Sequence, residues 1–308
     1  MKSLFLTIFV FFGVVTFAQD AGENVDAVSQ RPLVLIDEAH FNYPLVEASD
    51  KPFAAFLQES GYRVSSLTVP FEKESLDTGQ VLIIAMPLAE RNRIRGNPDT
   101  GWETEDWSLP NPSAFSDHEI AVIKSWVVDG GSLLVIFDHM PFAGAVAELA
   151  RAFSIEVSNG HARDSVTGPM IFSRSNGTLT DHVITNGFSP AERIESVATF
   201  GGAAFRSDAD LEPILVFGPS VVSFTPDVAH QITDETRSIS VNGWFQGAVG
   251  TFGHGRAAFF GEAGMFFAVV MSLSERDDCG DDCWTSVAEQ NPQLLLNVLG
   301  WLSEFPKK

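Results

Sequence analysis

The amino-acid sequence predicts an α/β protein built on a doubly wound, mostly parallel sheet, with a β-rich second half. In the first half, short and wholly apolar runs alternate with amphipathic stretches. Such apolar runs are typical of parallel strands that are buried on both faces, and amphipathic stretches are typical of the helices that cover them. From 155 to 260, short β-like runs alternate instead with Gly, Pro, Ser and Asn turns, and they could extend the same sheet.

Five stretches are predicted as strands of this sheet. Each is short, rich in aliphatic or aromatic residues, and followed by a turn or by polar residues. The predicted strands are 33–36, 63–69, 81–86, 133–137 and 256–260.

Two of the predicted helices have recognisable starts. Asp50 can cap a helix that has Pro52 in its first turn, and Gly61 ends this helix. Ser116 and Glu119 have the spacing of a capping box, in which each side chain binds the backbone of the other residue. Both starts follow a predicted strand, as expected for strand–helix alternation.

Two further helices complete the predicted set. Residues 143–153 form one of them. The other closes the chain, with Asn291 as its cap and Pro292 at its first position. A stripe of Leu and Val residues along this last helix predicts that one of its faces is buried.

The N-terminal residues predict export from the cell. Residues 1–18 have a short basic start, an apolar run and small residues before a cleavage site, which is the pattern of a signal peptide. The apolar run is shorter than the roughly 18 residues that a membrane-spanning helix needs, so an uncleaved anchor is the weaker alternative. We therefore expect a periplasmic or secreted protein without stable membrane insertion after cleavage. Residues 19–31 are predicted as a linker, and 32–305 as a single domain.

Residues 88–115 show no periodicity and are predicted to form a long loop. Loops of this length are usually functional or disordered. Trp102, Trp107 and Phe115 argue against simple disorder, because disordered segments contain few aromatic residues. The loop is therefore interpreted as a lid or a pocket wall.

The tetrapeptide Asp37-Glu38-Ala39-His40 matches a motif that names a class of helicases, but the rest of the chain excludes that function. A helicase needs a phosphate-binding loop of the form G-x-x-x-x-G-K-[ST], and no Lys of this chain follows a Gly. The net charge is −21, and so acidic a protein repels nucleic-acid backbones. The sequence also has no G-x-S-x-G, H-E-x-x-H or G-x-G-x-x-G motif that would indicate an esterase, a zincin or a dinucleotide-binding protein.

The only two cysteines are Cys279 and Cys283. In an exported protein, two cysteines this close are most simply interpreted as a local disulfide. A structural zinc site would need two more ligands, and a cysteine nucleophile would need a strand leading into this acidic segment.

Polar residues follow three of the predicted strands and indicate a site. A doubly wound sheet binds its ligand outside the carboxyl ends of its parallel strands. Carboxylates and imidazoles at that edge are candidates for catalysis, since such groups gather where metal binding or pKa tuning is needed. The candidate catalytic residues are Asp37, Glu38, His40, Asp138, His139 and Glu262. The candidate ligand-binding residues are Asn42, Trp107, Met140, His182 and Met265.

Three chemistries fit these residues. The carboxylates with His40 and His139 could bind a divalent metal ion that activates water. A carboxylate such as Glu38 or Glu262 could instead act as a general base without a metal. In a non-catalytic sugar pocket, the carboxylates would accept hydrogen bonds from hydroxyl groups, and Trp107 would form a flat apolar wall.

Three segments resemble those of a known family. "GGSLLVIFDHMPFAGA", "DHVITNGF" and "GHGRAAFFGEAGMF" are similar in order and pattern to the trehalose-utilisation family and to wider relatives of the class I glutamine amidotransferase-like superfamily. The further segments "DEAHFNYP", "DWSLPNPSAF" and "LLLNVLGWL" resemble uncharacterised secreted bacterial proteins of that superfamily. The resemblance covers about residues 32 to 303.

The resemblance implies a flavodoxin-like sheet with a pocket at its carboxyl edge. It does not imply glutaminase activity, because the turn that would carry the nucleophilic Cys carries Asp138 and His139. Together these observations predict a hydrolase that acts on a carbohydrate-like small molecule. The alternative is a non-catalytic ligand- or carbohydrate-binding module of the cell envelope.

Overall fold

The computed structural model describes residues 30–42, 52–89, 107–164, 168–267 and 288–304, together with the backbone at 94–97 and 101–104. The chain divides into two units, Met1–Arg31 and Pro32–Lys308, and the described residues belong almost wholly to the second. The predicted signal peptide and the predicted disulfide between Cys279 and Cys283 lie outside the described residues. The same holds for nearly all of the predicted linker.

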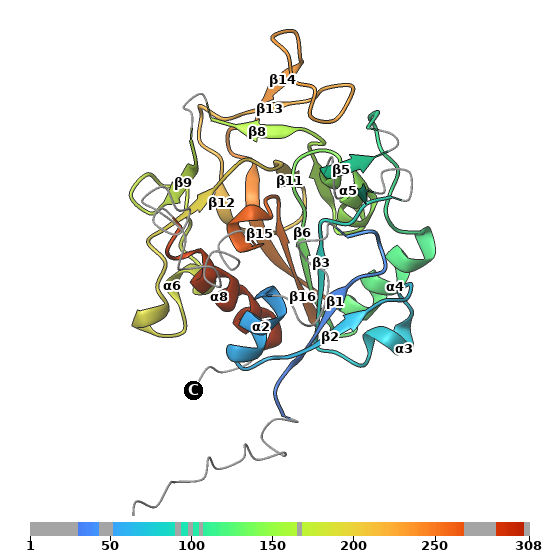
Figure 1. Ribbon diagram of the computed structural model, residues 1–308. Helices are drawn as coiled ribbons and strands as arrows, with labels where there is room; N and C mark the ends of the chain where they lie inside the picture. Colours follow the sequence, from blue (N-terminus) through green and yellow to red (C-terminus); the bar gives the residue numbers. More distant parts are fainter. Residues whose placement is uncertain are drawn as a thin grey trace, which may run out of the picture. The chain divides into compact units, whose positions relative to one another are not determined.

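A nine-stranded sheet forms the centre of the second unit (Figure 1). Its parallel part confirms the five predicted strands, and β3 and β6 are buried along their whole length. In order across the sheet, the parallel strands are β2 (Arg63–Leu67), β1 (Leu33–Asp37), β3 (Val81–Ala85), β6 (Ser132–Ile136) and β16 (Gly255–Phe260). The structure is therefore of the α/β class, as predicted.

The second half of the chain extends the same sheet with antiparallel pairings, as predicted. β15 pairs with β16, both β11 and β12 pair with β15, and β7 pairs with β11 at the edge. These strands are β15 (Phe245–Phe252), β11 (Phe205–Ser207), β12 (Glu212–Val216) and β7 (Ile155–Val157). The edge that is formed by the carboxyl ends of the parallel strands therefore extends from β2 to β16.

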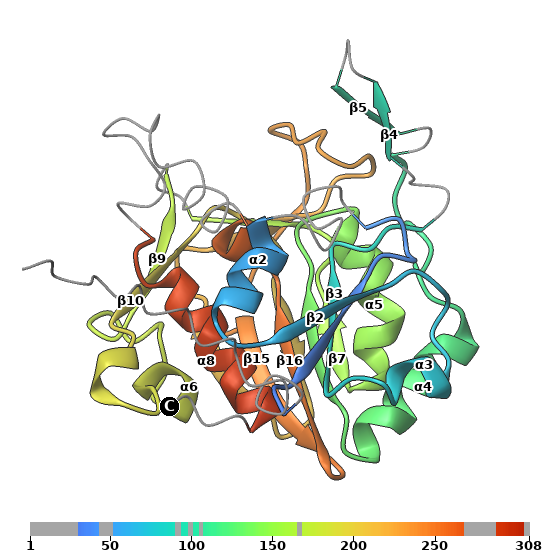
Figure 2. The same ribbon diagram turned by 60° about the horizontal axis from the view of Figure 1, so that its bottom comes forward.

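Smaller sheets account for the remaining strands. They are β9 (Met170–Ser173) with β10 (Ser196–Thr199), β8 (His161–Arg163) with β13 (Val222–Phe224) and β14 (Ser238–Ser240), and β4 (Ile94–Asn97) with β5 (Gly101–Thr104). The β4–β5 pair lies within the long loop predicted over 88–115 (Figure 2). Cross-strand pairing stabilises this hairpin, although its sequence lacks the apolar alternation from which a strand is predicted.

Helices cover both faces of the central sheet. In Figure 2, α2 and α8 lie on one side of the sheet, and α4 and α5 lie on the other. Alternate residues of each buried strand point to opposite faces: Leu134 packs in the core beneath α2 and α8, and Leu133 packs in the core beneath α4 and α5. The helical segments are α2 (Pro52–Glu59), α3 (Lys73–Leu76), α4 (Asp117–Val128), α5 (Phe142–Ala152), α6 (Val183–Asn186), the short 3₁₀ turn Pro190–Glu192, and α8 (Asn291–Ser303).

Two of the three predicted caps lie within the described residues and have different outcomes, whereas Asp50 lies outside those residues. Ser116 and Glu119 form the predicted capping box at the start of α4. Asn291, predicted as the cap of the last helix, is instead the first residue of α8, with Gln290 at the cap position. The Asn291 side chain is fully buried and donates hydrogen bonds to the carbonyls of Ala198 (2.7 Å) and Met265 (3.0 Å). Its amide thus joins α8 to β10 and to the turn after β16.

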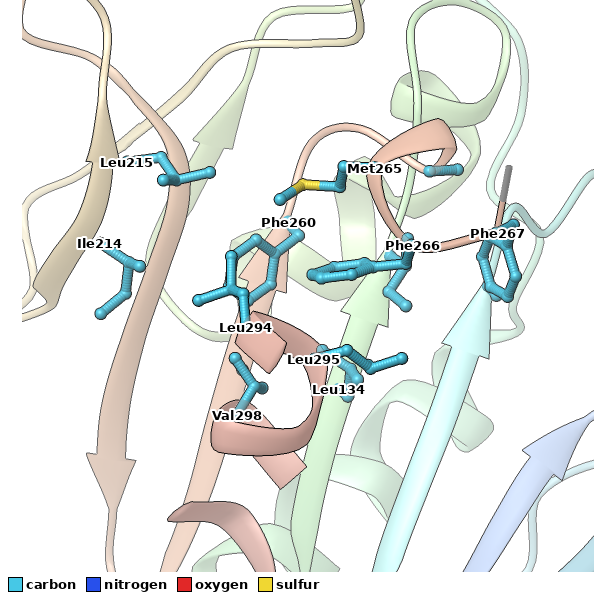
Figure 3. Close-up of a cluster of buried hydrophobic side chains, with 14 of the residues drawn as sticks. Leu134, Ile214, Leu215, Phe260, Met265, Phe266, Phe267, Leu294, Leu295 and Val298 are labelled. Carbon is cyan, nitrogen blue, oxygen red and sulfur yellow. The ribbon is translucent and has the colours of Figure 1, made fainter. Parts of the chain in front are cut away.

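The core above α8 holds one of the predicted ligand-binding residues. Figure 3 shows Met265 beside Phe260, with Phe266 packed above Leu294 and Leu295 of α8. Met265 has no exposed surface. The structure thus corrects the assignment of Met265 to a ligand site, because its side chain fills the hydrophobic core. Among the helices that the structure describes, none has the length and apolar character needed to cross a membrane.

Candidate functional site

The predicted polar residues form two groups at the carboxyl edge of the sheet. Asp37, His40 and Asn42 follow β1, while Asp138 and His139 follow β6. Strand β3 lies between β1 and β6, so roughly 10 Å separates these two strands. The two groups have different partners and different exposure.

The first group is a buried hydrogen-bond network, named here the Asp37–His40–Glu119 network. His40 Nδ1 lies 2.8 Å from Asp37 Oδ1, and His40 Nε2 lies 2.8 Å from Glu119 Oε1. The His40 ring also packs against Phe71 and Phe115, with centroids 4.6 and 4.8 Å away. An imidazole that faces a carboxylate at each nitrogen satisfies both contacts only when it is protonated.

Further hydrogen bonds satisfy the carboxylates of this network. Asn42 donates to Asp37 Oδ2 (3.2 Å) and to the carbonyl of Ala85 (2.8 Å). Glu119 Oε1 accepts the backbone N–H of Phe71 (3.1 Å), and Glu119 Oε2 accepts the Ser116 hydroxyl (2.8 Å). The network therefore connects the end of β1 with the start of α4.

The pKa shifts agree with an ion-paired network. Burial lowers the pKa of His40, but the hydrogen bonds and charges of Asp37 and Glu119 outweigh it, and the pKa is raised above 6.5. Burial likewise opposes ionisation of Glu119, yet hydrogen bonds from Ser116, His40 and Phe71 lower its pKa below 4.5. Both shifts thus favour the charged form of the group relative to its ordinary pKa.

This geometry corrects the prediction that Asp37, His40 and Asn42 line an open pocket. Asp37 has no exposed surface, and His40 and Asn42 are each 7% exposed. Their polar atoms are committed to one another and to Glu119, so they support the fold at the end of β1. Glu38 points elsewhere: its carboxylate accepts the hydroxyl of Ser66 on β2 (2.6 Å).

The second group surrounds His139 and includes two histidines that the sequence analysis did not single out. The rings of His139 and His161 lie 4.7 Å apart, and those of His139 and His230 lie 5.0 Å apart. Trp107 packs edge-on against His230 at 5.0 Å. We name these three imidazoles the His139–His161–His230 cluster.

Two surface segments bring the added histidines to His139. His161 is the first residue of β8, and the carbonyl of Gly160 accepts the N–H of Met140 (3.3 Å). His230 follows a segment that pairs with the end of the long loop, where Ala229 N–H donates to the carbonyl of Trp107 (2.8 Å). The backbone of His230 has a φ of 65°, which non-glycine residues rarely adopt.

Hydrogen bonds define which nitrogens of the cluster carry protons. His139 Nδ1 lies 2.9 Å from the carbonyl of Met140, which can only accept, so Nδ1 carries a proton. His161 Nδ1 accepts from Arg163 Nε (3.3 Å) and Nη2 (3.1 Å), so its proton is on Nε2. Neutral His139 therefore presents a basic Nε2, and neutral His161 presents an N–H donor.

The electrostatics keep two of these rings neutral. Burial, together with the electrostatic effects of His139, Arg163 and His230, lowers the pKa of His161 to about 3. Burial and His139 also lower the pKa of His230, against the opposing effect of Asp138. The cluster thus combines neutral imidazoles with one ring, His139, that has a carboxylate nearby.

That carboxylate is Asp138. Its Oδ1 accepts the N–H of His139 (2.6 Å) and lies 3.6 Å from His139 Nε2, and its Oδ2 accepts the N–H of Ala263 (3.1 Å). The His139 side chain is 24% exposed and that of Asp138 is 13% exposed. Asp138 and His139 thus form a pair that solvent can reach.

Glu262, predicted at the end of the late strand, lies next to this pair. Its two carboxylate oxygens accept the N–H groups of Gly264 (2.8 Å) and Met265 (2.6 Å). Burial and the charge of Asp138 raise the pKa of Glu262 well above 4.5, although these N–H donors and that of Phe200 oppose the shift. Glu262 therefore holds the turn after β16.

A cavity of about 690 Å³ lies beside the cluster, with His161 in its wall. Apolar parts of the wall come from residues such as Met170, Phe200 and Phe224, and a charged part comes from Arg163. Ligand pockets for small molecules are usually of this size and have this mixture of apolar walls and a few polar groups. The cavity and the cluster share His161 and so form one candidate site.

The remaining predicted residues have structural positions. Met140 is fully buried beneath the cluster. His182 caps α6, where its Nδ1 accepts the N–H of Ile184 (3.1 Å) and its Nε2 lies 3.3 Å from Glu212 Oε2. Because both ring nitrogens of His182 have partners within the chain, its position corresponds to a helix cap.

Metal binding was one of the predicted chemistries. Within the part of the chain that the structure describes, no group of three or more His, Cys, Asp or Glu residues is arranged to hold a metal ion.

Comparisons with known proteins show the fold alone. The sequence matches no protein-family model, and a search of curated proteins finds no match. Among solved structures, the mmIFT52 N-terminal domain is similar, with 15% identity, a TM-score of 0.57, and coverage of 89% of this chain and 99% of that chain.

Two weaker structural similarities involve bacterial proteins. A cytoplasmic protein, STM3548 from Salmonella typhimurium, has 15% identity and a TM-score of 0.48. The matched region covers 88% of this chain and 98% of the Salmonella chain. A putative ThuA-like protein from Bacteroides uniformis has 11% identity and a TM-score of 0.42. The matched region covers 89% of this chain and 92% of the Bacteroides chain. The resemblance to the trehalose-utilisation family remains a prediction from the sequence.

Proposed function

We propose that this chain is a secreted or periplasmic hydrolase that acts on a small, carbohydrate-like molecule at the carboxyl edge of its sheet. One observation carries the proposal. Asp138, His139, His161, His230 and Glu262 gather where β6 and β16 end, and His161 is also part of the wall of a cavity of about 690 Å³. Perturbed titratable groups beside a cavity are a recognised mark of catalytic sites.

His139 is the proposed general base. Its Nδ1 proton is held by the carbonyl of Met140, which leaves Nε2 free to accept a proton from water. The Asp138 carboxylate, 3.6 Å from this Nε2, stabilises the imidazolium that forms. The resulting hydroxide attacks the electrophilic carbon of the substrate, and the leaving group takes the proton back from His139.

His161 is the proposed donor to the oxygen that gains negative charge. Its Nε2 carries the proton because Nδ1 accepts from Arg163. A Cβ at residue 201 would lie 2.5 Å from this Nε2, so Gly201 leaves the donor uncovered. A neutral N–H donor that is fixed before the reaction stabilises an oxyanion without reorganisation.

The substrate class and the location of the protein rest on further features. Aromatic surfaces at the site, from Trp107 beside His230 and from Phe200 and Phe224 in the cavity, suit the apolar face of a sugar ring. The N-terminal pattern supports export. A net charge of −21 supports a small-molecule ligand over a nucleic acid.

Turnover of a substrate panel tests this proposal. The purified protein is assayed against esters, amides and glycosides of sugars, together with a His139→Gln variant. Loss of a general base usually lowers the rate about 10²- to 10⁴-fold, and we expect a loss of this size. His254→Gln is the matched control, because His254 is exposed in the turn before β16, at the opposite end of that strand from Glu262.

One outcome would contradict the role of His139, and another would contradict the hydrolase. Equal activity of His139→Gln and the wild type would remove His139 from the reaction. Binding of a sugar by the wild type, with no turnover of any member of the panel, would instead identify a non-catalytic binding module.

A further inference from the structure

The guanidinium of Arg163 has an unusual partner. Its Nε and Nη2 donate to His161 Nδ1, and it lies 6.0 Å from the centre of the Phe224 ring. Arg163, His161 and Phe224 all line the cavity beside the His139–His161–His230 cluster. An arginine at the cavity wall is thus oriented by an imidazole and an aromatic ring.

Other arginines of the described chain pair with carboxylates. These ion pairs are Arg151 with Glu148, Arg174 with Asp181, Arg193 with Glu195, Arg206 with Glu156, and Arg256 with Glu304. Within the described residues, no carboxylate forms an ion pair with Arg163. Among the described arginines Arg237 shares this feature, but it does not line the cavity that Arg163 lines.

The neutral state of His161 allows it to accept from Arg163. Burial and the nearby ring and guanidinium groups lower the pKa of His161 to about 3, so its Nδ1 accepts from the guanidinium and the ring does not repel it as a cation would. The two N–H groups that face His161 fix the plane of the guanidinium. The edge formed by Nη1 and the second hydrogen of Nη2 keeps its donors, in the geometry that binds a carboxylate with two parallel hydrogen bonds.

We propose that Arg163 anchors a carboxylate group of the ligand, so that the substrate class is an acidic, carbohydrate-like molecule such as a sugar acid. This inference rests on the proposed function, since it assigns a ligand to the same cavity. The overall acidic surface repels anions, and a guanidinium in the cavity wall that forms no ion pair among the described residues attracts an anionic ligand locally.

A neighbouring polar pair fits the same ligand. Asp164 also lines the cavity, and its Oδ2 accepts the hydroxyl of Ser220 (3.0 Å). A carboxylate so placed accepts hydrogen bonds from ligand hydroxyl groups and repels a second ligand carboxylate. Arg163 and Asp164 side by side thus favour a molecule with one acid group and several hydroxyl groups.

Binding of matched ligand pairs tests the inference. Each sugar acid or hydroxy acid is compared with its neutral counterpart, beginning with D-glucuronate and D-glucose, by saturation-transfer NMR followed by calorimetry. We expect the acidic member of a pair to bind better, and Arg163→Met to weaken its binding about ten- to hundredfold through loss of a charge-assisted contact. Arg163→Lys keeps the positive charge but not the two parallel N–H donors of the guanidinium. Its binding of the acid should therefore be intermediate between that of the wild type and that of Arg163→Met.

Arg206→Met is the matched control. Arg206 also lies over an aromatic ring, at 4.6 Å from the centre of Trp244, but it pairs with Glu156 and lies on β11. Its substitution should leave acid binding unchanged. Circular dichroism shows whether Arg163→Met folds. If it does not fold, the salt dependence of binding by the wild type tests the inference instead. Higher ionic strength should weaken binding of the acid and leave binding of the neutral sugar unchanged.

The outcomes separate this inference from the proposed function. Equal binding of both members, or acid binding that survives Arg163→Met, would overturn the role of Arg163 and leave the small-molecule site in place. If no member of any pair binds, both proposals fail.

Discussion

Replacing His40 by Leu tests whether the Asp37–His40–Glu119 network stabilises the fold. The substitution removes the hydrogen bonds to Asp37 Oδ1 and Glu119 Oε1, each 2.8 Å long, and keeps an apolar group between Phe71 and Phe115. It leaves two carboxylates close together without the imidazolium that separates them. We therefore expect a substantial loss of stability.

The size of the loss follows from the contacts that remain. Removing one partner of a buried ion pair typically costs about 3–5 kcal/mol. Asp37 keeps the N–H of Ala39 (3.0 Å) and the amide of Asn42, and Glu119 keeps donors from Phe71 and Ser116. Because these donors still compensate part of each charge, we expect the lower end, about 3 kcal/mol, or roughly 6–12 °C in the thermal midpoint of a domain of this size.

The loss should depend on pH with a defined sign. The pKa of folded His40 is raised above 6.5, so its contribution is fully present below pH 6.5 and disappears as the pH rises through the folded value. The pKa of folded Glu119 is lowered, so its contribution is present above pH 4.5 and disappears as the pH falls through the folded value. The difference between wild type and His40→Leu should therefore be largest between about pH 4.5 and 6.5.

Urea unfolding at pH 6 and at pH 9 measures this difference. His118→Leu is the control, because His118 also contacts a carboxylate, that of Glu72 at 3.0 Å, but lies on the surface. We expect no resolvable change for His118→Leu. A His40→Leu variant as stable as this control at pH 6, or a difference that grows at pH 9, would refute the charged network.

Three further predictions concern the core and the site. Asn291→Leu should destabilise the protein by about 2–4 kcal/mol in chemical unfolding, because it leaves the buried backbone groups of Ala198 and Met265 without partners; stability within the error of the wild type would contradict this. The ring signals of His161 should not titrate by NMR between pH 5 and pH 8, since its pKa is about 3, and a midpoint in that range would contradict its burial beside His139. Gly201→Ala should abolish ligand binding and lower the thermal midpoint, because its Cβ would lie 2.5 Å from His161 Nε2 and its φ is +142°; unchanged binding would remove Gly201 and the His161 donor from the site.

Strands buried on both faces were predictable because burial leaves a signature in composition. Residues 81–86 and 133–137 contain an uninterrupted apolar run, and they correspond to β3 and β6. The capping box of Ser116 and Glu119 was predictable because it depends on residues three positions apart. The β4–β5 hairpin depends on pairing alone, and the position of Asn291 depends on tertiary contacts with β10, so neither had a local signal.

The site was predictable only in part, for a related reason. Asp138, His139 and Glu262 lie at the ends of β6 and β16, where the rule for parallel sheets places ligand sites. His161 begins a strand of a separate small sheet, and His230 lies in a loop between β13 and β14, so no rule about the central sheet leads to them. Only the paired segments at Gly160 and Trp107 bring these rings to His139.

The two histidine environments at this edge explain why one group is structural and the other is a candidate for chemistry. His40 lies between two carboxylates, so its proton is held from both sides and its nitrogens have no capacity left for a ligand. His139 lies among imidazoles, and the only carboxylate near its Nε2 within the described residues is 3.6 Å away, so this nitrogen remains accessible to a ligand. The distinguishing residue is Glu119: the same side chain that completes the capping box of α4 with Oε2 closes the His40 site with Oε1. A Glu119→Gln variant would therefore loosen the His40 ring without altering the His139–His161–His230 cluster.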